Sequence, residues 1–140
     1  MEIVLILLAF LAFAGWAFSF YFLQVLRGNL HPDIWWMPSI CRMSENSCIL
    51  ITDTFYGKTF GQPNALWGSY YYPVVVLAVI LIQRGIFPIA FLIIPATIAF
   101  LSSLYLLWGL YKLKTVCKVC LAIHVVNIST FFMVITVIGK

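Results

Sequence analysis

The chain has 140 residues, of which 64% are hydrophobic and only 9% are charged, and its mean hydropathy is +1.09. A soluble domain of this size has too little interior to bury so much apolar surface, so the composition indicates an integral membrane protein. The formal charge of +4 comes from eight Lys and Arg against four scattered Asp and Glu, which argues against a nucleic-acid partner and bears on membrane topology instead.

Four apolar segments are each long enough to cross a bilayer as a helix, which takes roughly 20 residues. The first runs from about residue 3 to 26. It lacks the basic start and the small-residue cleavage site of a signal peptide, so we expect a spanning helix. The loop that follows, residues 28–63, carries Cys41 and Cys48. From Cys48 onward it is compatible with a short amphipathic helix, which Gly57 and the run Gly61-Gln62-Pro63 would end.

The second, third and fourth spans are predicted at about 65–82, 86–111 and 116–138. Asn64 precedes the second span as a candidate N-cap, and Pro95 inside the third is of the kind that often kinks a spanning helix. Short connections force these spans to be antiparallel neighbours. The sequence therefore predicts an all-α, single-domain bundle of four transmembrane helices. In such a bundle the loop after the first helix and the link after the third lie on the same membrane side.

The most informative motif is the C-x-x-C of Cys117 and Cys120 at the start of the fourth span. On a helix these cysteines share one face with His124 and Asn127, because the spacing is three, four and three residues. Polar groups at membrane depth are costly and usually face a bundle interior or a functional cavity. The pattern indicates a polar, sulfur-bearing stripe on a helix that otherwise suits lipid.

The loop cysteines, Cys41 and Cys48, are expected on the same membrane side as the C-x-x-C motif, so the two pairs can exchange disulfides. Three interpretations are open. The pairs can form a thiol oxidoreductase, in which Lys118 favours the thiolate of Cys117. The four thiols can bind zinc, although a hydrophobic bundle has no need of a structural metal. The cysteines can also be structural, in a non-catalytic membrane bundle.

If the pairs form a thiol oxidoreductase, the cysteine pair on the membrane helix can meet a lipid-soluble oxidant such as a quinone. Two polar side chains near the motif are candidates for binding an oxygen of that quinone. His124 lies one helical turn after Cys120 and can donate a hydrogen bond or move a proton. Asn64 is expected on the same membrane side and can donate a hydrogen bond as well as cap its helix. The chain carries no Gly-rich phosphate loop, Walker motif or hydrolase triad.

The order of these elements resembles the vitamin K epoxide reductase family. The resemblance covers nearly the whole chain and includes the loop cysteine pair, the run FGQPNALWG at residues 60–68 with tyrosines after it, and the final C-x-x-C. The order of these elements is what is specific to the family, since a C-x-x-C motif alone would not identify it. The DsbB family runs a similar reaction, but its C-x-x-C stands in the first loop and it fits less well.

The resemblance implies roles for all four cysteines. Cys117 and Cys120 would be the active-site pair beside the quinone, with Cys120 nearer the ring. Cys48 would form the disulfide that joins the two pairs, through Cys117, and Cys41 would exchange with a partner protein. This chain has no fused thioredoxin-like domain, so the expected partner is a separate thioredoxin-fold protein.

The resemblance also implies a quinone pocket. Asn64 resembles the asparagine that hydrogen-bonds the quinone oxygen, Tyr72 matches a pocket tyrosine, and Thr54 falls near a family serine or threonine. His124 departs from the vertebrate pattern, which has a tyrosine there, and this argues against vitamin K epoxide as the substrate.

These inferences combine into a quinone-dependent thiol oxidoreductase that generates disulfide bonds and needs no metal. Electrons would pass from the partner through the two cysteine pairs to menaquinone or ubiquinone. The first alternative is reduction of vitamin K epoxide or quinone on the same residues. The alternative of another class is a non-catalytic membrane bundle with structural cysteines.

Two arguments predict opposite orientations in what we expect to be a prokaryotic cell membrane. Most family members hold their cysteines outside the cytoplasm, in an oxidising compartment. Short loops rich in Lys and Arg tend to stay cytoplasmic, however. The predicted opposite side has only Arg84 and Lys140, whereas the cysteine side carries Arg27, Arg42, Lys58, Lys112, Lys114 and Lys118. The charge count therefore predicts an inverted orientation, with the cysteines facing the cytoplasm.

Overall fold

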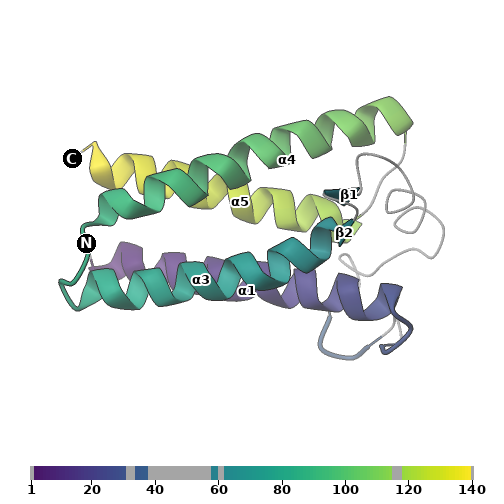
Figure 1. Ribbon diagram of the computed structural model, residues 1–140, viewed down its shortest axis with the longest axis horizontal. Helices are drawn as coiled ribbons and strands as arrows, with labels where there is room; N and C mark the ends of the chain where they lie inside the picture. Colours follow the sequence, from purple (N-terminus) through teal and green to yellow (C-terminus); the bar gives the residue numbers. More distant parts are fainter. Residues whose placement is uncertain (1, 31–33, 38–57, 60–61, 115–117, 140) are drawn as a thin grey trace.

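The computed structural model describes residues 2–30, 34–37, 58–59, 62–114 and 118–139. The α-helices labelled in Figure 1 are α1 (Glu2–Leu26), α3 (Asn64–Gln83), α4 (Ile93–Leu113) and α5 (Lys118–Ile138). A short 3-10 helix, η3 (Ile89–Leu92), directly precedes α4. Just before α3, strands β1 (Lys58–Thr59) and β2 (Gln62–Pro63) pair in an antiparallel hairpin.

Four segments are long and apolar enough to cross a membrane, and these are Glu2–Leu26, Asn64–Gln83, Ile89–Lys112 and Lys118–Ile138. Only 17 to 28% of each span is buried inside the protein. The outward faces carry large apolar side chains such as Phe10 and Ile98, which are more than half exposed. Lipid is the solvent that suits such a surface. The predicted all-α, four-span membrane bundle is confirmed.

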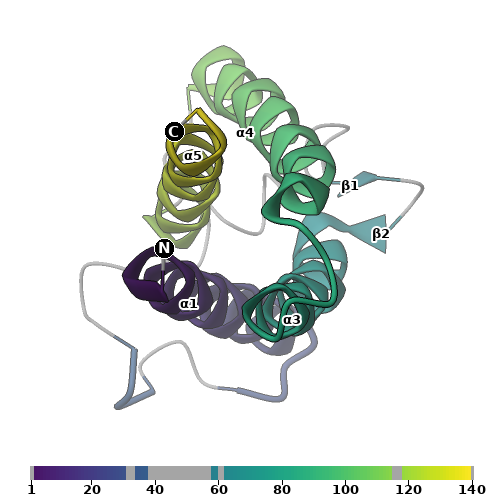
Figure 2. The same ribbon diagram turned by 90° about the vertical axis from the view of Figure 1, so that its left-hand side faces the viewer.

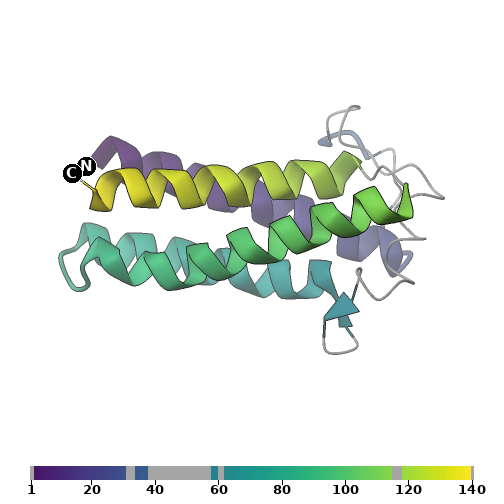
Figure 3. The ribbon, with the colours of Figure 1, turned by 90° about the horizontal axis from the view of Figure 1, so that it is seen from above.

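The direction of the helices gathers four helix termini at one end of the bundle. There α1 and α4 end, and α3 and α5 begin (Figures 1 and 3). We name this the cysteine end, because the connections that carry Cys41, Cys48 and Cys117 leave from it. At the opposite end α1 begins, α5 ends, and residues 84–88 connect α3 to η3. The antiparallel arrangement expected from the short connections is therefore present.

The helices pack in the spatial order α3, α1, α5, α4, as the end-on view in Figure 2 shows. Helix α1 packs along both α3 and α5, and α5 also packs along α4. Helix α3 meets the α4 side mainly through η3, and the two long helices diverge toward the cysteine end. The bundle is thus closed on three sides and is least tightly packed between α3 and α4.

Small residues allow the close packing of α1 on α3. A Cβ added at Gly15 of α1 would lie closer than 3.0 Å to three ring atoms of Tyr72. Likewise, a Cβ added at Gly68 of α3 would collide with the hydroxyl of Ser19. Spanning helices commonly use small residues in this way, because close backbone approach increases van der Waals contact where no hydrophobic effect drives association.

The third span differs from the prediction of one continuous, Pro-kinked helix over 86–111. Pro88 precedes the 3-10 helix η3, and α4 starts only at Ile93. Pro95 therefore lies in the first turn of α4, where its missing N–H costs no helical hydrogen bond. Among the described residues, Pro73 of α3 is the proline that lies in the interior of an α-helix.

The amphipathic helix considered from Cys48 up to Gly57 lies outside the described residues and stays a prediction. Strand β1 (Lys58–Thr59) follows Gly57, one of the residues expected to end that helix.

Candidate functional site

Four of the seven predicted site residues lie in the part of the chain that the structure describes, namely Asn64, Tyr72, Cys120 and His124. The other three, Cys41, Cys48 and Cys117, lie outside the described residues. The pairing of the four thiols therefore stays a prediction, as does any role for Thr54, which also lies outside them.

Helix α5 carries the predicted polar stripe on its inward face. His124 is only 5% exposed, and Cys120 and Asn127 are partly buried. The neighbouring Leu121 and Val125 are exposed on the outer face, Val125 by 63%. This division follows from the helical spacing, which repeats one face every three or four residues. His124, Cys120 and Asn127 thus lie toward the bundle interior, whereas Leu121 and Val125 lie toward lipid.

A hydrogen-bonded chain of three side chains crosses the interior beside this stripe. The hydroxyl of Tyr72 on α3 donates to Oδ1 of Asn127 on α5. The Nδ2 of Asn127 in turn donates to Oγ of Ser103 on α4, at 2.9 Å. Tyr72 is 2% exposed and Ser103 1%. A single asparagine therefore links the two helices that diverge from one another.

Sequence reasoning placed Asn127 on the stripe but missed Ser103. A serine in a spanning helix is a weak signal, because its hydroxyl can bond to a carbonyl of its own helix. Thr97, Thr130 and Thr136 do so, each donating to the carbonyl four residues earlier. Ser103 differs because its described hydrogen bond is to another helix.

His124 carries the one buried side-chain polar atom that lacks a hydrogen-bond partner among the described residues, its Nδ1. A buried polar atom without a partner costs about 1–3 kcal/mol, and in native proteins its explanation is strain, a redox or catalytic role, or a bound water or ion. His124 lies one turn from Cys120 on one side and one turn from Asn127 on the other. The imidazole is therefore placed between the thiol and the hydrogen-bonded chain.

Asn64 is the first residue of α3 and lies at the cysteine end, partly buried. Helices α3 and α5 run in the same direction, and Tyr72 contacts Asn127. Asn64 lies eight residues, or about 12 Å, before Tyr72 on α3, and Val119 lies eight residues before Asn127 on α5. Asn64 is therefore at the membrane depth of Val119 and the adjacent Cys120. Two depths therefore carry candidate ligand-binding groups, with Asn64 near the thiol and Tyr72 deeper in the bundle.

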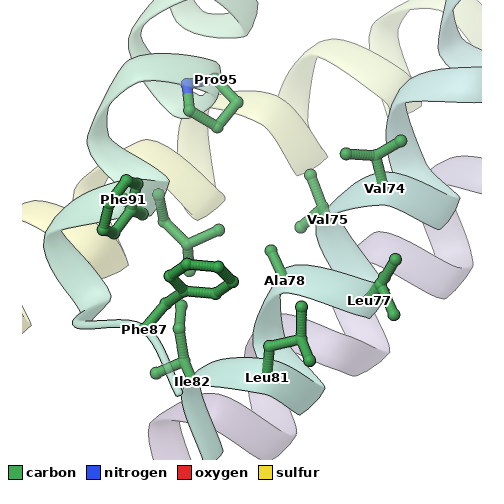
Figure 4. Close-up of a pocket in the computed structure, with 10 residues that line it drawn as sticks. Val74, Val75, Leu77, Ala78, Leu81, Ile82, Phe87, Phe91 and Pro95 are labelled. Carbon is green, nitrogen blue, oxygen red and sulfur yellow. The ribbon is translucent and has the colours of Figure 1, made fainter. Parts of the chain in front are cut away.

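An apolar groove of about 320 Å³ lies between α3 and the segment around η3. Figure 4 shows Val75 and Ala78 of α3 directed toward Phe87 across the groove. All ten residues that line the groove are apolar, among them Val75, Ala78, Ile82, Phe87, Phe91 and Pro95. The groove occupies the loosely packed side of the bundle.

Tyr71 marks the inner end of this groove. Its hydroxyl donates to the carbonyl of Pro95 at 3.3 Å and so joins α3 to α4. The rings of Tyr71 and Tyr72 pack edge to face, with centroids 5.0 Å apart. Val75 lies one turn beyond these tyrosines on α3, away from the cysteine end. The apolar groove therefore reaches the Tyr72 hydrogen-bonded chain from the direction of the opposite end of the bundle.

The four apolar spans define the class, which is an integral membrane protein. The sequence profile of the vitamin K epoxide reductase family matches residues 6–135. The chain therefore belongs to this family, as the resemblance predicted, and the family match makes it an oxidoreductase. Comparison with curated proteins and with solved structures gave no match.

Proposed function

We propose that this protein is a quinone-dependent thiol oxidoreductase that generates disulfide bonds. Two thiols of a partner become one disulfide, and a quinone takes up the two electrons and two protons to become a quinol. The observation that carries the proposal is the buried face of α5, where His124 lies between Cys120 and Asn127 and its Nδ1 has no hydrogen-bond partner among the described residues. A non-catalytic bundle gives no reason to leave that nitrogen without a hydrogen bond.

The proposed electron path uses both cysteine pairs in order. A reduced thioredoxin-fold partner attacks the Cys41–Cys48 disulfide through a mixed disulfide and leaves oxidised. The reduced loop pair then exchanges with Cys117–Cys120, and a thiolate of that pair passes its electrons to the quinone. Lys118, whose side chain is exposed at the start of α5, adds positive charge that favours the thiolate form of Cys117.

The described interior fits a quinone of the menaquinone or ubiquinone kind. Asn64, Tyr72 and His124 supply hydrogen-bonding groups for the oxygens of a quinone ring. The apolar groove between α3 and η3 supplies a lipid-facing surface suited to an isoprenoid tail. Pockets for such ligands are mostly apolar with a few placed polar groups, which is the composition found here.

The second candidate is reduction of vitamin K epoxide, which the family's name favours. It uses the same cysteines and the same pocket. His124, where the vertebrate pattern has a tyrosine, favours the disulfide-generating reaction instead.

The test is a thiol-to-quinone assay on the purified protein in detergent. Quinone reduction is followed by absorbance with dithiothreitol as the electron donor, and then with a reduced thioredoxin-fold protein. We expect turnover with ubiquinone or menaquinone analogues and none in a Cys120→Ser variant. Turnover of vitamin K epoxide but not of quinone would favour the second candidate. Absence of any thiol-dependent reduction, with the protein folded, would refute both.

A further inference from the structure

The chain from Tyr72 through Asn127 to Ser103 has a direction. Tyr72 donates its only hydroxyl proton to Asn127 Oδ1, and Asn127 passes a proton of Nδ2 to Ser103 Oγ. In this direction the Tyr72 oxygen has lone pairs left and no proton to give. Tyr72 can therefore accept a hydrogen bond from a ligand but cannot donate one.

The same three side chains can pair equally well in the opposite direction. An asparagine amide carries a donor and an acceptor at nearly equivalent positions. After a half turn of the amide, the Ser103 hydroxyl would donate to Oδ1 and Nδ2 would donate to Tyr72 Oη. All internal hydrogen bonds are kept, and the Tyr72 proton becomes free to point at a ligand.

We propose that Asn127 is a positioning residue whose amide sets whether Tyr72 donates or accepts at the quinone site. This inference rests on the proposed function. A quinone oxygen is a carbonyl and needs a donor, whereas a quinol oxygen carries a proton and needs an acceptor. Reversal of the Asn127 amide lets one tyrosine serve both redox forms, so neither substrate nor product leaves a buried hydrogen-bonding group unpaired.

The surroundings hold the tyrosine ring in place and leave the proton as the part that changes. The ring is confined by Gly15, at which an added Cβ would collide with the ring, and by the ring of Tyr71. At the other end, the Ser103 hydroxyl has its one described hydrogen bond with Asn127, so its own proton can turn toward the amide. Thr130, one turn further along α5, cannot take this part, because it donates to the carbonyl of Val126 in its own helix.

The test compares affinities for the two redox forms in the full-length protein reconstituted in detergent. The KM for a short-tailed quinone and the inhibition constant of the matching quinol are measured for wild type and for Asn127→Leu. With leucine, Tyr72 keeps its proton for the quinone, so we expect the quinone KM within about twofold of wild type. The quinol should bind about threefold to tenfold more weakly, since only in the quinol complex is the buried proton of Tyr72 left without an acceptor. Thr130→Val, which removes a buried hydroxyl from the same helix, should change neither constant.

A second background separates this positioning role from a structural one. A Tyr72→Phe variant lacks the hydroxyl that Asn127 controls. Adding Asn127→Leu to that variant should therefore change the ratio of the quinone KM to the quinol inhibition constant by less than about twofold. Asn127→Ser, which is too short to bridge both partners, should behave like Asn127→Leu and is available if the leucine variant does not fold.

Equal weakening of both redox forms by Asn127→Leu, or an effect that persists in Tyr72→Phe, would overturn the inference and leave the proposed function intact. A wild-type protein that reduces no quinone with thiols would overturn the proposed function, and the inference with it.

Discussion

The ring of Tyr72 lies directly on Gly15, so that two helices and one hydrogen-bonded chain share a single point of contact. We expect Gly15→Ala to force the ring or the helix to move. Overpacking of this kind costs about 1–3 kcal/mol, and it should also disturb the hydroxyl of Tyr72. Thermal unfolding in detergent should show a lower midpoint than wild type, together with weaker quinone reduction. Gly139→Ala, whose added Cβ would meet only carbonyls of its own helix region, is the control and should change neither.

Replacement of His124 or Asn64 should slow quinone reduction but leave exchange between the cysteine pairs intact. Under the proposed function, each of His124→Ala and Asn64→Ala removes one hydrogen bond to the quinone, worth about 0.5–1.5 kcal/mol. We therefore expect a loss of severalfold to tenfold in kcat/KM for the quinone. Val125→Ala on the lipid-facing side of α5 serves as the control. Unchanged kinetics in both variants would remove these residues from the site.

Filling the apolar groove should discriminate quinones by tail length. Ala78→Phe places a large side chain where the isoprenoid tail is expected to lie. The KM for a long-tailed quinone should rise severalfold, whereas that for a tail-less analogue should stay within about twofold, since the polar groups are untouched. Ile80→Phe, on the same helix but outside the groove, should affect neither. An equal rise for both quinones would mean that the groove does not hold the tail.

The relay predicts a trapped intermediate. If Cys48 and Cys117 are the exchanging pair, Cys120→Ser removes the thiol that resolves their disulfide. The variant should accumulate a Cys48–Cys117 bond, detectable by peptide mapping without reduction. Recovery of only Cys41–Cys48, with Cys117 free, would show that a different pair exchanges.

The orientation of the bundle in the membrane can be read from the membrane side on which a single cysteine thiol is labelled. A variant that keeps only Cys41 is treated in intact and in lysed cells with a membrane-impermeant maleimide. The Lys and Arg distribution predicts much slower labelling in intact cells, because the cysteine end would then face the cytoplasm. Equal labelling rates in both preparations would instead establish the orientation usual for the family.

Much of the fold could be predicted from the sequence, because the informative signals are local. Span length and apolar composition predicted α1, α3 and α5 closely, and short connections predicted their directions. The inward position of His124 and Asn127 followed from helical spacing alone. These features depend on residues within one helix, so neighbouring positions in the sequence carry the information.

The missed features depend on contacts between helices. Nothing in the sequence distinguishes Ser103 from its neighbour Ser102, and only the packing of α4 against α5 selects the former as the partner of Asn127. The groove depends on how α3 packs against the segment around η3, which no single segment specifies. The start of α4 at Ile93 depends on two prolines and an intervening 3-10 helix, and single residues decide such boundaries.

The interior on the far side of Asn127 has a consequence for bioenergetics. Toward the end at which α1 begins, the described core consists of apolar side chains such as Leu8, Val79 and Val134. The hydroxyl of Thr130 there is bonded within its own helix, so the described residues form no hydrogen-bonded route for protons from that side. Under the proposed function, the protons that convert quinone to quinol enter from the cysteine end, together with the electrons of the thiols. Negative and positive charge then move the same distance across the bilayer, so each turnover is electroneutral. The enzyme would neither add to the membrane potential nor be slowed by it.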